Sequence, residues 1–113
     1  MSVFMYDAVT TVPLAITNID AYLEWVEQTM EVDAWNALEA HVLQERSELV
    51  NHARYIEDGE VHAIRFFSTE AAATASLETT RNLSTLSATT FSEVTEVTEN
   101  DMASYMLRNM NGL

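Results

Sequence analysis

The sequence predicts an α+β fold with an antiparallel sheet, and three observations lead to this class. Residues 49–68 hold two β-rich runs joined by Asp58-Gly59, the strongest short-range signal for a β-hairpin. Apolar residues at helical spacing lie on both sides of this hairpin. Residues 91–98 then alternate between apolar and polar types, which predicts a last strand. Because the chain has 113 residues and no linker-like stretch, we expect residues 1–113 to form one domain.

A two-residue loop at Asp58-Gly59 sets the register of the predicted hairpin. It places these residues opposite one another: Ile56 and Val61, Tyr55 and His62, Arg54 and Ala63, Ala53 and Ile64, His52 and Arg65, and Val50 and Phe67. Alternation along each strand then sorts the side chains onto two faces. One face carries Leu49, Asn51, Ala53, Tyr55, His62, Ile64 and Phe66, and the other carries Val50, His52, Arg54, Ile56, Val61, Ala63, Arg65 and Phe67.

Both faces of this hairpin are substantially apolar. A hairpin with one solvated face would alternate cleanly between apolar and polar residues. We therefore expect both faces to be covered, one by helices and the other by a second subunit, and this predicts a homodimer.

Two helices are predicted between the first strand and the hairpin. Residues 3–12 are β-branched and aromatic, and Pro13 closes this first strand. Thr17 or Asn18 can cap a helix. The apolar face of this helix consists of Ile19, Tyr22, Leu23, Val26 and Met30. Asp33 can cap a second helix that runs to about Ser47, and the alternative is one kinked helix.

A further helix follows the hairpin and starts at Glu70, with Ser68 or Thr69 as its cap. Small side chains dominate one side of this helix, which lets it lie close to a sheet. We place that side at Ala72, Ala75, Thr79, Leu83 and Leu86.

A short terminal helix follows the last strand, with Asn100 or Asp101 as its cap and Gly112 at its end. The element order is thus β, α (long or split), β, β, α, β, α. This order is that of the ferredoxin-like βαββαβ fold with an extra helix before strand two and a short C-terminal helix.

The segment GEVHAIRFFSTEAAATASLETTRNL resembles the dimeric α+β barrel superfamily, especially the small proteins grouped with antibiotic biosynthesis monooxygenases. In those proteins an aromatic-ended third strand runs into an acidic, alanine-rich helix start. The resemblance extends over roughly residues 49–98 and implies a dimer of two sheets face to face, with a pocket between each sheet and its helices. The haem-degrading members need a tryptophan where this chain has Phe66 and Phe67, and a helix histidine, whereas no histidine follows His62 here. We therefore do not expect haem degradation.

The composition argues against several function classes. Eighteen acidic and five basic residues give a net charge of −13, and all five basic residues are arginines. Such a surface repels phosphate backbones and anionic membranes, so we expect neither a nucleic-acid nor a membrane partner. The absence of cysteine excludes thiol catalysis. With no basic stretch before an apolar core at the start, and no apolar run near about 18 residues, we expect a soluble cytoplasmic protein.

The histidines provide a candidate acid–base pair but no metal site. His41, His52 and His62 lack the close spacing that metal-binding histidines usually show, so we expect no metal and no cofactor. Tyr55 and His62 face one another across the hairpin and could act as catalytic proton donor and acceptor near neutral pH. The alternative for Tyr55 and His62 is a cross-strand packing pair.

Two of the five arginines share one face of the hairpin with His52, namely Arg54 and Arg65. If this face is buried, their guanidinium groups need anions. The anion is either a carboxylate of the protein or the carboxylate of a ligand held by a guanidinium fork. The candidate partners within the protein are Asp7, Glu93 and Glu96. Whether the arginines face a helix-side cavity or a dimer interface stays open.

Three classes of function follow. The first is a small-molecule-binding protein for an elongated apolar acid, such as a fatty acid, with His52, Arg54, Arg65, Phe66 and Phe67 as ligand-binding residues. The second is a cofactor-independent, monooxygenase-like enzyme acting on an aromatic or polyketide-like substrate through Tyr55 and His62. The third is a structural or protein-interaction module. No stretch of the sequence decides whether the protein is an enzyme.

Overall fold

Five strands form one antiparallel sheet in the computed structural model, which describes residues 2–44, 49–84 and 88–111. Four helices accompany the sheet within these residues, and the α+β class is thereby confirmed. The elements are β1 (Ser2–Thr11), α1 (Ile19–Thr29), α2 (Val32–Gln44), β2 (Leu49–Glu57), β3 (Glu60–Phe67), α3 (Glu70–Leu83), β4 (Thr89–Phe91), β5 (Thr95–Thr98) and α4 (Glu99–Asn111).

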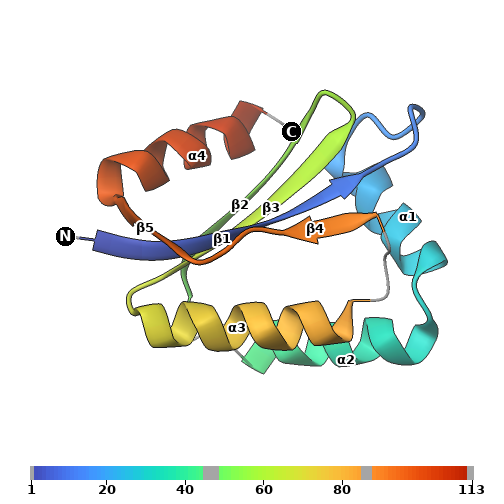
Figure 1. The fold of residues 1–113 in the computed structure, drawn as a ribbon. Coiled ribbons are helices and arrows are strands. Elements are labelled where there is room, and N and C mark those ends of the chain that lie inside the picture. The colour runs from blue at the N-terminus through green and yellow to red at the C-terminus, as the bar shows by residue number, and fades with distance from the viewer. Residues whose placement is uncertain (1, 45–48, 85–87, 112–113) are drawn as a thin grey trace.

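The strand order across the sheet is β2-β3-β1-β4, and β5 also pairs with β1 (Figure 1). β1 lies next to the hairpin and pairs with β3 from Phe4 opposite Phe67 to Thr11 opposite Glu60. On its other side β1 pairs with β4 and then with β5. This order is compatible with a ferredoxin-like fold.

The hairpin has the predicted register at its turn end but not at its far end. Asp58 and Gly59 both have positive φ, at 53° and 79°, as a two-residue hairpin turn requires. The predicted pairs from Ile56 and Val61 to His52 and Arg65 are confirmed. The pairing of Val50 with Phe67 is wrong, because a bulge between Leu49 and Asn51 places Leu49 opposite Phe67.

The last strand is interrupted, which corrects the prediction of one strand over residues 91–98. β4 ends at Phe91 and β5 begins at Thr95. Between them the Asp7 backbone N–H donates to Ser92 Oγ at 2.9 Å, and the Ser92 N–H donates to the Asp7 carbonyl at 2.9 Å. A serine side chain thus takes the place of a backbone acceptor, and the regular ladder stops there.

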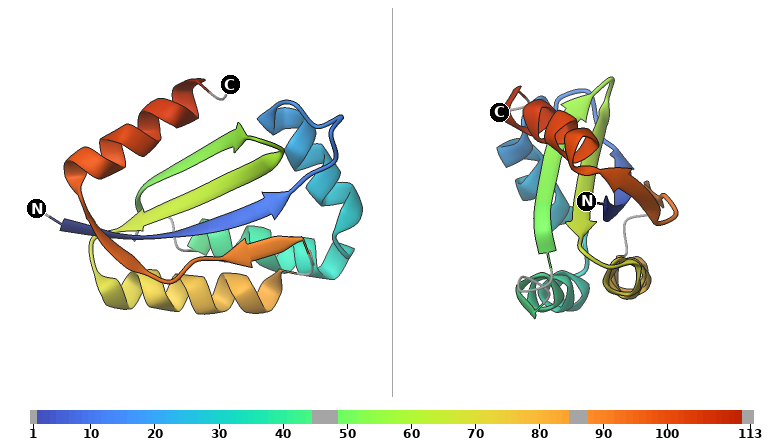
Figure 2. Two further views of the ribbon diagram at one scale, coloured as in Figure 1. Left: turned by 45° about the horizontal axis from the view of Figure 1, so that its top comes forward. Right: turned by 90° about the vertical axis from the view of Figure 1, so that its left-hand side faces the viewer.

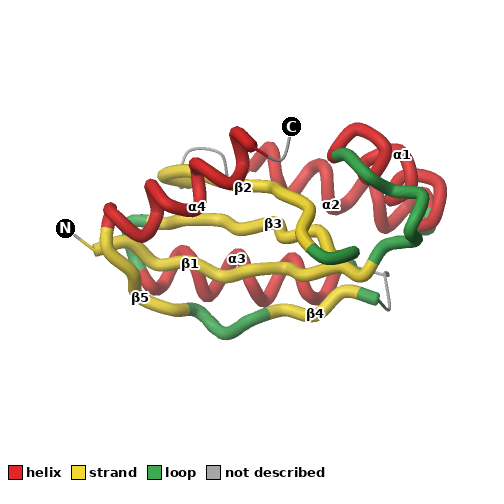
Figure 3. The backbone as a smooth tube through the Cα atoms, turned by 90° about the horizontal axis from the view of Figure 1, so that it is seen from above, coloured by secondary structure: helices red, strands yellow, loops and turns green. Residues whose placement is uncertain are grey.

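Helices cover both faces of the sheet (Figures 1 and 2). α4 lies on one side, and α2 and α3 lie on the other, with α1 beside the end of β1. Seen from above, α4 crosses over β2 and β3 (Figure 3). The cover over the second face of the hairpin is therefore the chain's own α4, where the sequence predicted a second subunit.

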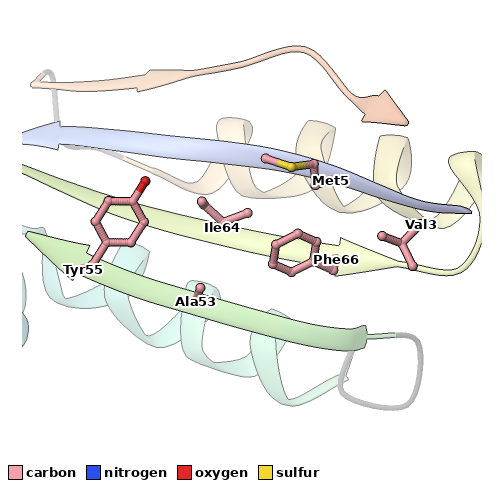
Figure 4. Close-up of a cluster of buried hydrophobic side chains, with 6 residues drawn as sticks. All are labelled: Val3, Met5, Ala53, Tyr55, Ile64 and Phe66. Atoms are coloured by element: carbon pink, nitrogen blue, oxygen red, sulfur yellow. The ribbon is translucent and has the colours of Figure 1, made fainter. Parts of the chain in front are cut away.

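The face under α4 carries a close-packed apolar cluster, shown in Figure 4. Its buried members are Val3, Met5, Ala53, Tyr55, Ile64 and Phe66. Partly buried residues of β5 and α4 pack against them, namely Val97, Met102, Tyr105 and Met106. On the opposite face a second cluster gathers near the end of β1 and comprises Val12, Ile19, Tyr22, Val26, Met30 and Val61.

The predicted caps of α1 and α3 are confirmed. Asn18 Oδ1 accepts from the N–H of Ala21, and Thr69 Oγ1 accepts from the N–H of Ala72. α1 and α2 are separate helices, which excludes the alternative of one kinked helix. α2 begins at Val32, so the predicted cap Asp33 lies inside its first turn.

The cap of α4 lies two or three residues before the predicted Asn100 or Asp101. Thr98 Oγ1 accepts from the N–H of Asp101, and Asp101 Oδ2 accepts from the N–H of Thr98. This reciprocal pair is a capping box, so Asn100 and Asp101 belong to the first turn. The predicted end at Gly112 lies outside the described residues.

The side of α3 that faces the sheet is one residue away from the predicted one. Ala75 and Thr79 are exposed, and Ala72 is only partly buried. The buried residues are Ala73, Ser76, Leu77 and Thr80. Two of them carry hydroxyl groups, and their polarity concealed this side in the sequence. Leu86 of the predicted side lies outside the described residues.

Candidate functional site

A cavity of about 640 Å³ lies between the sheet and the helices α1, α2 and α3. Its volume falls in the range of small-molecule binding sites, which is about 300–1,000 Å³. The space for this cavity is created by small side chains on the sheet. Ala8 of β1 lies directly opposite Ala63 of β3, and both line the cavity. Two methyl groups in adjacent strands leave space that larger side chains would fill.

The cavity wall is mainly apolar on the side of α1 and α2. These helices contribute Leu23, Val26, Trp35 and Leu38, and Met30, the C-cap of α1, lies with them. Exposed carboxylates of the same helices also border the cavity, namely Glu24, Glu27 and Glu39. Hydroxyl-bearing residues lie on the sheet and on α3, and they include Tyr6, Thr10, Thr80 and Thr89.

Arg54 and Arg65 both line this cavity. The structure thus places the two arginines on the side of α1 to α3, which is one of the two positions that the sequence left open. Burial lowers the pKa of Arg54 below its ordinary value, and the neighbouring charge of Arg65 lowers it further, whereas Tyr22 opposes the shift. Two guanidinium groups therefore share one partly desolvated wall.

Arg65 is held by hydroxyl groups of β1 and α3. Its Nη1 donates to Tyr6 Oη at 2.9 Å and to Thr80 Oγ1 at 2.9 Å. Tyr6 Oη also lies 2.8 Å from Ser76 Oγ and 3.2 Å from Thr80 Oγ1. Tyr6, Ser76 and Thr80 are all buried, so this cluster is a polar end of the cavity inside the protein.

Tyr22 is a functional candidate that the sequence concealed. Its spacing on α1 is that of a core residue, and it is buried, yet it lines the cavity. Burial raises the pKa of its phenol above 10.0, while a hydrogen bond with Thr10 and the charges of Arg54 and Arg65 act in the opposite direction. Only the fold shows that this phenol shares a cavity with the two arginines.

The predicted internal partner Asp7 is on the wrong face to reach the arginines. It alternates with Tyr6 along β1 and lies opposite Ile64, so its side chain is on the side of α4. There Asp7 Oδ2 lies 2.7 Å from His62 Nδ1. Glu93 and Glu96 are exposed, and neither of them lines the cavity.

Tyr55 and His62 do lie opposite one another, but their rings are stacked. The ring centroids are 4.7 Å apart and the planes differ by 9°. Tyr55 Oη accepts from Arg108 Nη1 of α4 at 3.2 Å. Burial raises the pKa of the Tyr55 phenol, and this hydrogen bond opposes the shift. Both residues are on the α4 side of the sheet, away from the cavity, and their catalytic role stays a prediction.

The other predicted ligand-binding residues lie outside the cavity. His52 is exposed on β2, although it pairs with Arg65 as predicted. Phe66 and Phe67 are both fully buried. Phe66 belongs to the cluster under α4, and Phe67 makes an edge-on contact with Tyr6. The structure therefore places Arg54 and Arg65 in the cavity wall, whereas His52, Phe66 and Phe67 do not line the cavity.

Within the described ranges, no three or more histidine, cysteine or acidic residues are grouped so that they could hold a metal ion. In the same part of the chain, no helix is both long and apolar enough to cross a membrane. Comparisons with protein-family models, curated proteins and solved structures found no significant match. The fold and the site thus define a small α+β protein with a cavity that carries two arginines.

Proposed function

We propose that the protein binds an elongated small molecule with an apolar body and a carboxylate, such as a fatty acid or a related oxidised chain. The observation that carries the proposal is the position of Arg54 and Arg65 in the wall of the 640 Å³ cavity. A carboxylate in a partly desolvated site gains charge-assisted hydrogen bonds of about 1.5–3 kcal/mol each. A neutral alcohol of the same length gains less.

The cavity wall on the side of α1 and α2 supports the proposal that the ligand has an apolar body. Val26 of α1 and the α1 C-cap Met30 lie there with Trp35 and Leu38 of α2. Met30 is flexible and can adapt to the shape of a chain. Burial of each CH₂ group against such a wall contributes about 0.8 kcal/mol, so a long chain gains more than a short one.

A titration with a long-chain acid and its matching alcohol tests the proposal. We expect the wild-type protein to prefer the acid, and Arg54→Ala and Arg65→Ala each to weaken acid binding by about 10- to 100-fold with little change for the alcohol. Arg81→Ala is the matched control, because Arg81 is exposed on α3 and does not line the cavity. Equal affinity for acid and alcohol, or unchanged acid binding in both cavity variants, would contradict the proposal.

A cofactor-independent enzyme is the second candidate, and the contact between Asp7 and His62 favours it. A carboxylate 2.7 Å from Nδ1 orients an imidazole and can support its action as a base. This centre is on the opposite face of the sheet from the cavity. Tyr55→Phe and His62→Gln should therefore abolish turnover if the pair is catalytic, while acid affinity in the cavity stays within about twofold. Loss of acid binding in both variants would mean that the two faces are not independent.

We also infer that the domain is ferredoxin-like and forms a homodimer. The strand order supports the ferredoxin-like fold, and the resemblance to dimeric α+β barrels supports the dimer. α4 occupies the face that the resemblance assigns to the partner sheet, so the contact would have to include α4 or other exposed apolar residues. Among these are Leu14, Val32 and Leu107. Light scattering at micromolar concentration should give about twice the 12.7 kDa chain mass, and a stable monomer would contradict the dimer.

A further inference from the structure

The contact between α4 and the sheet depends on methionine. Among the described residues of α4, Met102, Tyr105 and Met106 pack against the buried cluster that contains Met5. Two of these three side chains are thioethers, whose flexibility lets them fit an irregular apolar surface. α4 follows the last strand along the chain, so its release from the sheet displaces no described strand.

The methionines differ in their access to water. Met102 and Met106 are only partly buried, so a small oxidant dissolved in water can reach them. Met5 and Met30 are 8% and 4% exposed. Met5 belongs to the cluster on the α4 face and lies opposite Phe66, whereas Met30 belongs to the cluster on the other face. Since the chain has no cysteine, its thioethers are its only oxidisable sulfur atoms.

We propose that Met102 and Met106 are oxidation sites through which hydrogen peroxide releases α4 from the sheet. The thioether sulfur attacks one peroxide oxygen, and the O–O bond breaks as the S–O bond forms. The other oxygen leaves with the electron pair of the broken bond and takes up the proton of the transferred oxygen. The sulfur thus loses two electrons and becomes a sulfoxide, and hydrogen peroxide is reduced to water.

A sulfoxide weakens the contact of α4 because its oxygen is a polar hydrogen-bond acceptor. Side chains of the cluster such as Ile64 and Phe66 have no donor for it, so its burial loses hydration without replacement. One polar contact also joins α4 to the sheet, because Arg108 Nη1 donates to Tyr55 Oη at 3.2 Å. Release of α4 breaks this hydrogen bond and opens Met5 to the same oxidant.

Treatment with hydrogen peroxide, followed by peptide mass spectrometry, tests this order of events. We expect sulfoxide at Met102 and Met106 first, at Met5 after a lag, and at Met30 last. In the double variant Met102→Leu, Met106→Leu, which keeps the apolar packing, Met5 should be oxidised about fivefold more slowly than in the wild type. Met30→Leu is the matched control, because Met30 packs on the opposite face and its substitution should leave the oxidation of Met5 unchanged. Equal rates at Met5 in the wild type and the double variant overturn the proposal.

Amide hydrogen exchange measures the release of α4 directly. After oxidation of the wild type, we expect the amides of residues 99–111 to exchange about tenfold faster, while those of α3 stay unchanged as an internal reference. Reduction by methionine sulfoxide reductases should restore slow exchange, and this test needs no substitution. The double variant Met102→Gln, Met106→Gln, which carries polar side chains of similar length, should show fast exchange without peroxide. Unchanged exchange of α4 in protein whose Met102 and Met106 are fully oxidised would contradict the proposal.

Discussion

The two faces of the sheet are similar in apolar content but differ in how they are filled. On the α4 face, Met5 lies opposite Phe66, and both side chains are buried in a closed cluster. On the other face the corresponding central pair is Ala8 and Ala63, and a cavity lies above it. The two faces thus differ in the side-chain size of their central cross-strand pair. The large pair lies in a packed core, and the small pair leaves a cavity. Stability is expected to depend mainly on the first face and ligand binding on the second.

The largest expected effect is on the packed face. Phe66 is 0% exposed, and Phe66→Ala should lower the free energy of unfolding by about 3–5 kcal/mol through lost burial and a new void. Leu38 is partly buried and already borders empty space, so Leu38→Ala should cost about 1–2 kcal/mol. Urea denaturation of both variants measures the difference. Similar losses for the two variants would show that the faces are equally well packed.

A matched pair of alanines gives the sharpest test of the comparison. Ala53 is 0% exposed in the cluster under α4, and Ala53→Leu should destabilise the protein by about 1–3 kcal/mol because there is no room for it. Ala63→Leu instead fills the cavity, so it should leave stability unchanged or raise it slightly while weakening acid binding at least tenfold. Thermal unfolding and the acid titration report the two effects. A loss of stability in Ala63→Leu equal to that in Ala53→Leu would contradict the difference between the faces.

Much of the fold could be predicted because its signals are local. Asp58-Gly59 set the hairpin register, and the caps Asn18 and Thr69 were visible in the sequence. The errors occur where a side chain replaces a regular backbone contact. Ser92 bonds to the backbone of Asp7 and interrupts the last strand, and Thr98 caps α4 in place of the predicted Asn100 or Asp101.

The candidate site was predictable only in part, because it is assembled from distant elements. The sequence placed Arg54 and Arg65 on one face, but it could not decide what covers that face. Tyr6 and Thr80 are 74 residues apart and meet only in the folded chain. Strand alternation could have shown that Asp7 and Tyr6 point to opposite faces, but the register between β1 and β3 was needed to place Asp7 beside His62.

The smallest expected effect concerns the buried phenol of the cavity face. Burial raises the pKa of Tyr22 in the folded protein above its ordinary value of 10.0. The folded protein then holds the phenol proton more tightly than the unfolded chain does. This contribution to stability is fully present below about pH 10 and is lost as the pH rises through the folded pKa. Stability should therefore decline above about pH 9 in part because of Tyr22.

Tyr22→Phe isolates this contribution, because phenylalanine keeps the ring and removes the titrating group. We expect the free energy of unfolding, measured in urea between about pH 8 and pH 11, to decline less steeply in Tyr22→Phe than in the wild type. Other groups that titrate in this range act equally in both proteins and cancel in the difference. Parallel curves would mean that the Tyr22 phenol is as well solvated in the folded protein as in the unfolded chain. The cavity face would then be open to water at Tyr22.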